Sequence, residues 1–75
     1  MTIRLNNKIN RKIYEDRFLS FLRRNRGDLV ENSIVASGIG VNIAQANRLA
    51  DYLAKEGKIV IHQQGAGFSR RYCLS

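Results

Sequence analysis

Residues 35–49, with the sequence VASGIGVNIAQANRL, decide the fold that the chain is expected to adopt. Gly40 can take backbone angles that other residues avoid, so a tight turn is expected there. Asn42 is a good N-cap for a helix, and Gln45 three residues later completes a capping-box pattern. Ala36, on the other side of the turn, is small enough for two helices to cross closely. The stretch therefore predicts two helices that meet at a turn.

The two predicted helices span residues 33–37 and 43–56, and Gly57 follows the second as its closing residue. In the longer helix, helical periodicity separates an apolar face from a polar face. The apolar face comprises Ile43, Ala46, Leu49, Ala50 and Leu53, and the polar face comprises Ala44, Asn47, Arg48, Asp51 and Lys55. We expect the apolar face to lie in the core and the polar face to meet solvent.

A further helix is predicted upstream, over residues 12–25. Its apolar residues recur at helical spacing, at positions Tyr14, Phe18, Phe21 and Leu22. The helix carries Glu15 and Asp16 early and arginines at its end, an order that complements the helix dipole. This structural role competes with phosphate binding as an explanation of those arginines. Residues 1–11 are predicted to form a basic N-terminal arm.

The segment after the longer helix changes to a strand pattern. Residues 58–62 are rich in β-branched side chains, residues 63–67 suit a turn, and residues 68–74 predict a second strand. Residues 29–30 form a short apolar pair that suits either a small strand or a connector. Three helices and a C-terminal β-hairpin predict an α+β fold, with one domain over residues 12–75.

The composition excludes several classes of protein. The chain has 75 residues, of which 44% are hydrophobic and none is proline, as suits one small helix-rich domain. A single cysteine excludes a disulfide framework or a cysteine-built zinc site within one chain. We expect a cytoplasmic location, since the sequence shows neither a signal peptide nor an apolar run of about 18 residues. The acidic residues and the lone histidine show no catalytic or metal-binding spacing, so an enzyme, a cofactor or a small-molecule substrate is not expected.

The charge points to a polyanionic partner. Thirteen Lys and Arg residues against six Asp and Glu residues give a net charge of +7. The first 26 residues carry +6, residues 27–57 carry −2, and the last 18 carry +3. A basic start and a basic end fit a nucleic acid that is gripped at both flanks. The alternative is a solvated basic surface that only keeps a small protein soluble.

The stretch at 35–49, together with the hairpin, resembles the winged helix-turn-helix domain of bacterial regulators. In that family a small residue lies four positions before a turn glycine and an apolar residue six after it, roles that fall here to Ala36, Gly40 and Ala46. The short single-domain format is similar to small regulators of fimbrial operons and to small phage or plasmid repressors. The resemblance implies sequence-specific binding of double-stranded DNA by a small transcriptional regulator.

The resemblance also implies roles for individual residues. The recognition helix would enter the major groove, with Asn42, Ala44, Gln45, Asn47 and Arg48 as its contacts. The hairpin, or wing, would meet the phosphate backbone through Lys58, Gln64, Arg70 and Arg71. The arm would add Arg4, Lys8, Arg11 and Lys12. The alternative for Arg48 is an ion pair with Asp51, three residues on. The alternative for the hairpin cations is a charged outer face that discourages edge pairing.

A second class of function stays open, namely a winged-helix module that binds protein or RNA without DNA specificity. Exposed apolar side chains such as Ile43 and Tyr52 would favour this class. One DNA-bound module buries only about 600–1,000 Å² of protein surface, so a homodimer or a protein co-regulator is also expected. His62 is expected at the surface, and Cys73 is expected to be a small buried residue.

Overall fold

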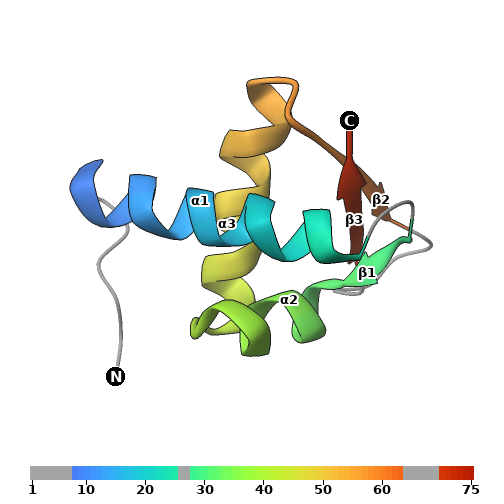
Figure 1. Ribbon diagram of the computed structural model, residues 1–75, viewed down its shortest axis with the longest axis horizontal. Coiled ribbons are helices and arrows are strands. Elements are labelled where there is room, and N and C mark those ends of the chain that lie inside the picture. Colours follow the sequence, from blue (N-terminus) through green and yellow to red (C-terminus); the bar gives the residue numbers. More distant parts are fainter. Residues whose placement is uncertain (1–7, 26–27, 64–69) are drawn as a thin grey trace.

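The computed structural model describes residues 8–25, 28–63 and 70–75. They form a small α+β fold of three helices and a three-stranded antiparallel sheet, in which α1 crosses α3 and the sheet packs beside both (Figure 1). In chain order the elements are α1 (Lys8–Arg24), β1 (Val30–Glu31), α2 (Asn32–Ile39), α3 (Ile43–Lys55), β2 (Ile59–Gln63) and β3 (Arg70–Leu74). This arrangement is compatible with the layout expected from the sequence. No helix in the described ranges is both long and apolar enough to cross a membrane.

Helix α1 begins at Lys8, four residues before the start that the sequence predicts for it, at residue 12. Arg11 and Lys12 lie in its first two turns, where they pair with Glu15 and Asp16 one turn on, each at 3.5 Å. Such pairs between residues four apart stabilise a helix modestly and help to extend it toward the N-terminus. The acidic residues therefore lie beyond the first turn, whereas Arg23 and Arg24 do occupy the last turn as expected.

The turn between α2 and α3 confirms the prediction from residues 35–49. Gly40 closes α2 in the left-handed conformation with φ of 82°, and its amide donates to the Ala36 carbonyl at 3.0 Å. Asn42 and Gln45 form the capping box: the Gln45 amide donates to Asn42 Oδ1 at 2.8 Å, and the Asn42 amide donates to Gln45 Oε1 at 3.1 Å. Helix α2 is longer than predicted, beginning at Asn32 and ending at Ile39.

The sheet has one strand more than the predicted hairpin. Its order is β1-β3-β2, because the apolar pair at residues 29–30 contributes to β1 and Val30 pairs with Tyr72. In the β2–β3 hairpin, Ile61 pairs with Tyr72 and Gln63 with Arg70. The predicted turn at residues 63–67 lies mostly outside the described residues. The central strand β3 therefore lies between a short edge and a longer one.

The core lies where the three helices and the sheet meet. Its largest fully buried side chains are Tyr72, Phe18, Leu22, Leu49, Leu53 and Val35, and the rings of Phe18 and Tyr72 pack with centroids 5.3 Å apart. Helix α1 meets α2 closely, since a Cβ added at Gly38 would lie 2.2 Å from the Phe21 ring. One residue of the predicted apolar face is misplaced: Ile43 is 44% exposed. It is the first residue of α3 and lies at the margin of that face, about 60° from Ala46.

Candidate nucleic-acid interface

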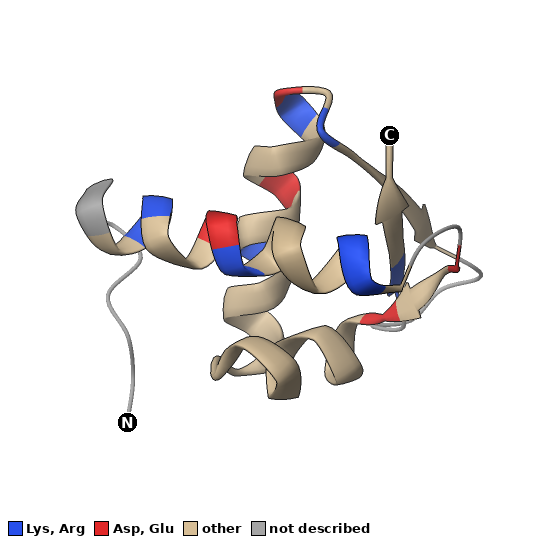
Figure 2. Cartoon of the chain, viewed as in Figure 1, with Lys and Arg blue, Asp and Glu red and all other residues tan. Residues whose placement is uncertain are grey.

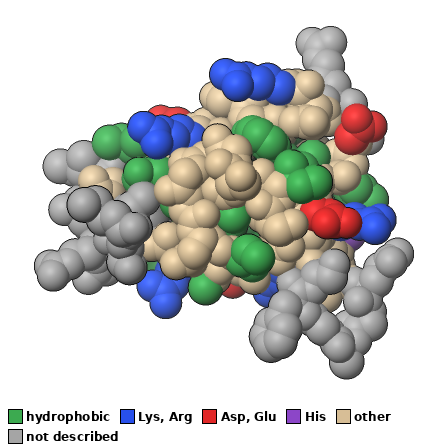
Figure 3. All heavy atoms as spheres, turned by 90° about the horizontal axis from the view of Figure 1, so that it is seen from below, with side chains coloured by type: hydrophobic (Ala, Val, Ile, Leu, Met, Phe, Trp, Pro, Cys, Tyr) green, Lys and Arg blue, Asp and Glu red, His purple; other side chains and the backbone are tan. Residues whose placement is uncertain are grey.

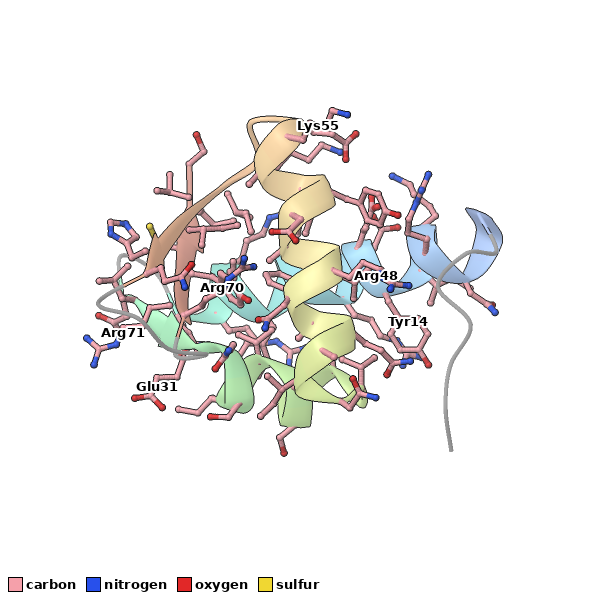
Figure 4. The ribbon with its side chains drawn as sticks, turned by 180° about the vertical axis from the view of Figure 1, so that it is seen from behind. Tyr14, Glu31, Arg48, Lys55, Arg70 and Arg71 are labelled. Atoms are coloured by element: carbon pink, nitrogen blue, oxygen red, sulfur yellow. The ribbon has the colours of Figure 1, made fainter. Side chains whose placement is uncertain are left out.

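Helix α3 presents one continuous face to solvent (Figure 4). Its exposed residues recur at helical spacing, with Asp51 at the edge nearest β3, and they comprise Ile43, Ala44, Arg48, Asp51, Tyr52 and Lys55. The opposite face is buried, since Ala46, Leu49, Ala50 and Leu53 are all fully covered. The division predicted from periodicity is thus largely confirmed, and the capping box holds the start of this helix.

Arg48 is the unpaired cation at the centre of the exposed face. Its predicted alternative partner, Asp51, instead accepts a hydrogen bond from Arg70 at 3.0 Å. Among the described residues no carboxylate lies within ion-pair distance of Arg48. The side chain projects from α3 on the side away from Arg70 and Arg71 (Figure 4). Arg48 is therefore available to an external acceptor.

Asn47, expected to contact a base, is instead used inside the molecule. The residue is half-buried, and its Oδ1 accepts hydrogen bonds from the Tyr72 hydroxyl and from Asn32 Nδ2, the latter at 3.2 Å. Asn47 lies at the edge of the polar face that turns toward the sheet, about 100° from Ala46, which is why periodicity alone places it with the exposed residues. Any contact of this carboxamide oxygen with a base would compete with these bonds.

The side chains of Asn42 and Gln45 also make hydrogen bonds within the molecule. Each uses its side-chain oxygen in the capping box, as the sequence pattern predicts. Ala44, between them in the sequence, is exposed and lies one turn before Arg48. Of the five residues predicted to contact DNA from this helix, Ala44 and Arg48 are thus the two whose side chains face outward without an internal hydrogen bond.

The two hairpin arginines face opposite ways, as strand alternation predicts. Arg71 is exposed on the outer face of the sheet, in register with His62 on β2 and Glu31 on β1. Arg70 faces α3, where its side chain is only 23% exposed and pairs with Asp51. Burial by itself lowers the pKa of Arg70, but hydrogen bonds to Asp51 and Tyr72 outweigh it, so the net pKa is raised. Arg71 is therefore the open cation of the hairpin.

Tyr72 stays neutral and serves as a hydrogen-bond donor. Burial raises the pKa of its phenol above the ordinary value, although the neighbouring Arg70 guanidinium opposes the shift. The protonated hydroxyl donates to Asn47, so Tyr72 links the middle of β3 to α3.

Several predicted cations meet in a groove between α1 and the end of α3. The groove has a volume of about 340 Å³ and is lined by Arg11, Lys12, Glu15, Tyr52, Lys55, Glu56 and Lys58. The Arg11 guanidinium lies over the Tyr52 ring, 4.7 Å from its centroid. Lys58 therefore lies with the α1 residues and not with the hairpin arginines, because it precedes β2 at the end remote from Gln63 and Arg70. Arg11 and Lys12, which were expected to act as part of the basic arm, likewise lie in helix α1.

The remaining predicted residues can be placed only in part. Arg4 and Gln64 lie outside the described residues, and of Lys8 only the backbone is described. His62 is exposed as expected, whereas Cys73 is half-buried and not fully buried, with its Sγ 3.8 Å from His62 Nε2. No cluster of potential metal ligands occurs in the part of the chain that the structure describes.

The surface below α2 differs from the α3 face. Charged residues occur on α1, on α3 and along the sheet, but α2 has none (Figure 2). Seen from below, hydrophobic side chains are spread over the middle of this surface and charged ones stand around its rim (Figure 3). Ile34 on α2 is 52% exposed and Ile43 on α3 is 44% exposed. This surface is therefore uncharged and partly apolar.

The sequence did not reveal the roles of Asn32, Asp51 and Tyr72. Their polar contacts join residues 15 to 25 positions apart, and no local motif marks such a pairing. Comparison with models of protein families, with curated proteins and with solved structures finds no match. A functional assignment for this chain thus depends on the geometry of its own residues.

Proposed function

We propose that the chain is a winged-helix protein that binds double-stranded DNA in a sequence-dependent way, as a small transcriptional regulator. In this proposal α3 is the recognition helix and lies in the major groove. The observation that carries the proposal is the unpaired Arg48 at the centre of the exposed face of α3. An arginine in this position can donate two hydrogen bonds to one guanine.

Cations on either side of α3 support this placement. Arg71 lies on the hairpin side, whereas the start of α1 with Arg11 and Lys12 lies on the other side of α3 (Figure 4). The major groove is about 12 Å wide and is bounded by the two phosphate backbones. Lys55 lies seven residues beyond Arg48, a rise of about 10 Å along the helix. A helix in the groove would thus have cations near both strands.

The proposal is tested by selecting a preferred duplex from a random pool and measuring affinity for it and for a scrambled duplex at fixed salt. Arg48→Ala should lower the preference about five- to 150-fold, the range expected for one guanine contact. Arg23→Ala is the matched control, because it removes a helical arginine that is also exposed, but from α1. An Arg48→Ala protein that retains the full preference would contradict the role of α3.

A second candidate function follows from the exposed apolar residues. Ile34, Ile43 and Tyr52 are 52%, 44% and 37% exposed, which favours a partner protein or RNA over a bare DNA reader. The same titration with folded RNA separates the two candidates. Preferential binding to RNA, or binding to neither nucleic acid, would support the interaction module. A further expectation of the DNA proposal is a second copy at the site, which sedimentation of the complex would detect.

A further inference from the structure

Two side chains of α3 form hydrogen bonds with neighbouring side chains of strand β3 in the hairpin. Asn47 and Asp51, one turn apart on α3, bond to Tyr72 and Arg70, two residues apart on β3. We call these four residues the α3–β3 seam.

We propose that Arg70 is a positioning residue, which, together with Asp51, fixes the hairpin relative to α3 and does not itself contact DNA. This inference depends on the proposed function. The guanidinium is the less exposed partner of the pair, with 23% of the side chain exposed against 60% for Asp51. Asp51 neutralises its charge, and a partly buried arginine that is already paired with a carboxylate is a poor ligand for phosphate.

Because of the seam, removal of the Asp51 carboxylate should have an effect on DNA binding opposite to the one that its negative charge predicts. An exposed carboxylate on the face toward DNA repels phosphate, so electrostatics alone predicts tighter binding when it is removed. If Asp51 instead holds the hairpin through Arg70, its removal loosens the hairpin and misplaces Arg71. The phosphate contact of Arg71 then no longer fixes how α3 sits in the groove. Preference for the selected duplex should therefore fall even though an anion has been lost.

A double-mutant cycle distinguishes these outcomes. Asp51→Ala, Arg70→Ala and the double variant are compared with wild type for their preference between selected and scrambled duplexes. The ratio of the two affinities should fall about two- to fivefold in each single variant, as expected for one surface ion pair, and no further in the double variant. Asp16→Ala is the matched control, since Asp16 is also a 60% exposed partner in an ion pair, but on α1. Its ratio should equal that of wild type.

Amide hydrogen exchange of β2 and β3 without DNA gives an independent readout. Exchange should be faster in both single variants than in wild type and equally fast in the double variant, and circular dichroism checks that each remains folded. Tighter binding by Asp51→Ala, with weaker binding of both duplexes by Arg70→Ala, would overturn the inference and assign Arg70 to a phosphate. Unchanged exchange in the single variants would also overturn it. If wild type binds no duplex, the proposed function fails, and exchange still decides whether the seam holds the hairpin.

Discussion

The two sides of α3 use similar polar residues for opposite purposes. On the side toward the sheet, Asn47 and Asp51 are bonded to Tyr72 and Arg70. On the outward side, Arg48 and Lys55 have no ion-pair partner among the described residues. The distance along the helix between the two kinds of residue is as little as one position, from Asn47 to Arg48. The two kinds of residue differ in their angle around the helix axis and in whether a side chain of the sheet lies opposite them.

This comparison shows how a small domain can fix the position of a helix and still leave one of its faces exposed to a partner. A chain of 75 residues has a limited core, so polar bonds on one side of α3 help to fix its orientation. Because Asp51 is taken by Arg70, Arg48 is left without its nearest acidic neighbour. The internal bonds on one side therefore contribute to the open charge on the other side.

The largest expected difference between substitutions on the two sides of α3 is in the stability of the fold. Asn47→Ala should lower the free energy of unfolding by about 2–3 kcal/mol, because the Tyr72 hydroxyl and Asn32 Nδ2 lose their common acceptor in a buried setting. Arg48→Ala, one residue along, should change it by less than about 0.5 kcal/mol. Urea unfolding of the two variants measures the difference. An equal decrease in the free energy of unfolding in both variants would show that the two sides of α3 contribute alike to stability.

A smaller effect is expected for the cations that flank the exposed face. Lys55→Ala should weaken binding to selected and scrambled duplexes alike, about fivefold near 0.15 M salt, as the loss of one phosphate contact predicts. The slope of log affinity against log salt should become shallower by about 0.9. Arg23→Ala, on α1, should leave the slope unchanged. A Lys55→Ala slope equal to that of wild type would exclude the groove beside α1 from the DNA interface.

The sequence predicted the parts of the fold that depend on local signals. Gly40, the capping box and the periodicity of α3 each act within a few residues, and the structure confirms them. Helix α1 begins four residues before its predicted start, and no local pattern marks the contact that Arg11 makes with the Tyr52 ring of α3. Asn47 was assigned to the exposed face because a helical wheel gives its angle but not the presence of Tyr72 opposite, 25 residues away. Sequence patterns thus predicted the helix of the candidate site, but not which of its polar side chains are bonded within the molecule.

The smallest effect is expected at high pH, where the seam itself can titrate. The pKa of Tyr72 is raised above its ordinary value of 10.0, chiefly by burial. The folded state therefore holds this proton more tightly than the unfolded state. The resulting stability is fully present below pH 10 and is lost as the pH rises through the folded value.

Tyr72→Phe removes both the bond to Asn47 and this titration. At pH 7 the variant should be less stable than wild type by about 1 kcal/mol, the net worth of one hydrogen bond. Above pH 10 the gap should narrow, because only wild type then loses stability by ionising a phenol at this position. Urea unfolding at pH 7 and above pH 10 measures the gap, and Asn47→Ala, which retains the phenol, should keep the alkaline loss. If the difference in stability between wild type and Tyr72→Phe did not change with pH, the phenol would be as accessible to water in the folded chain as in the unfolded chain. The sheet side of α3 would then be as open to solvent as its outward side.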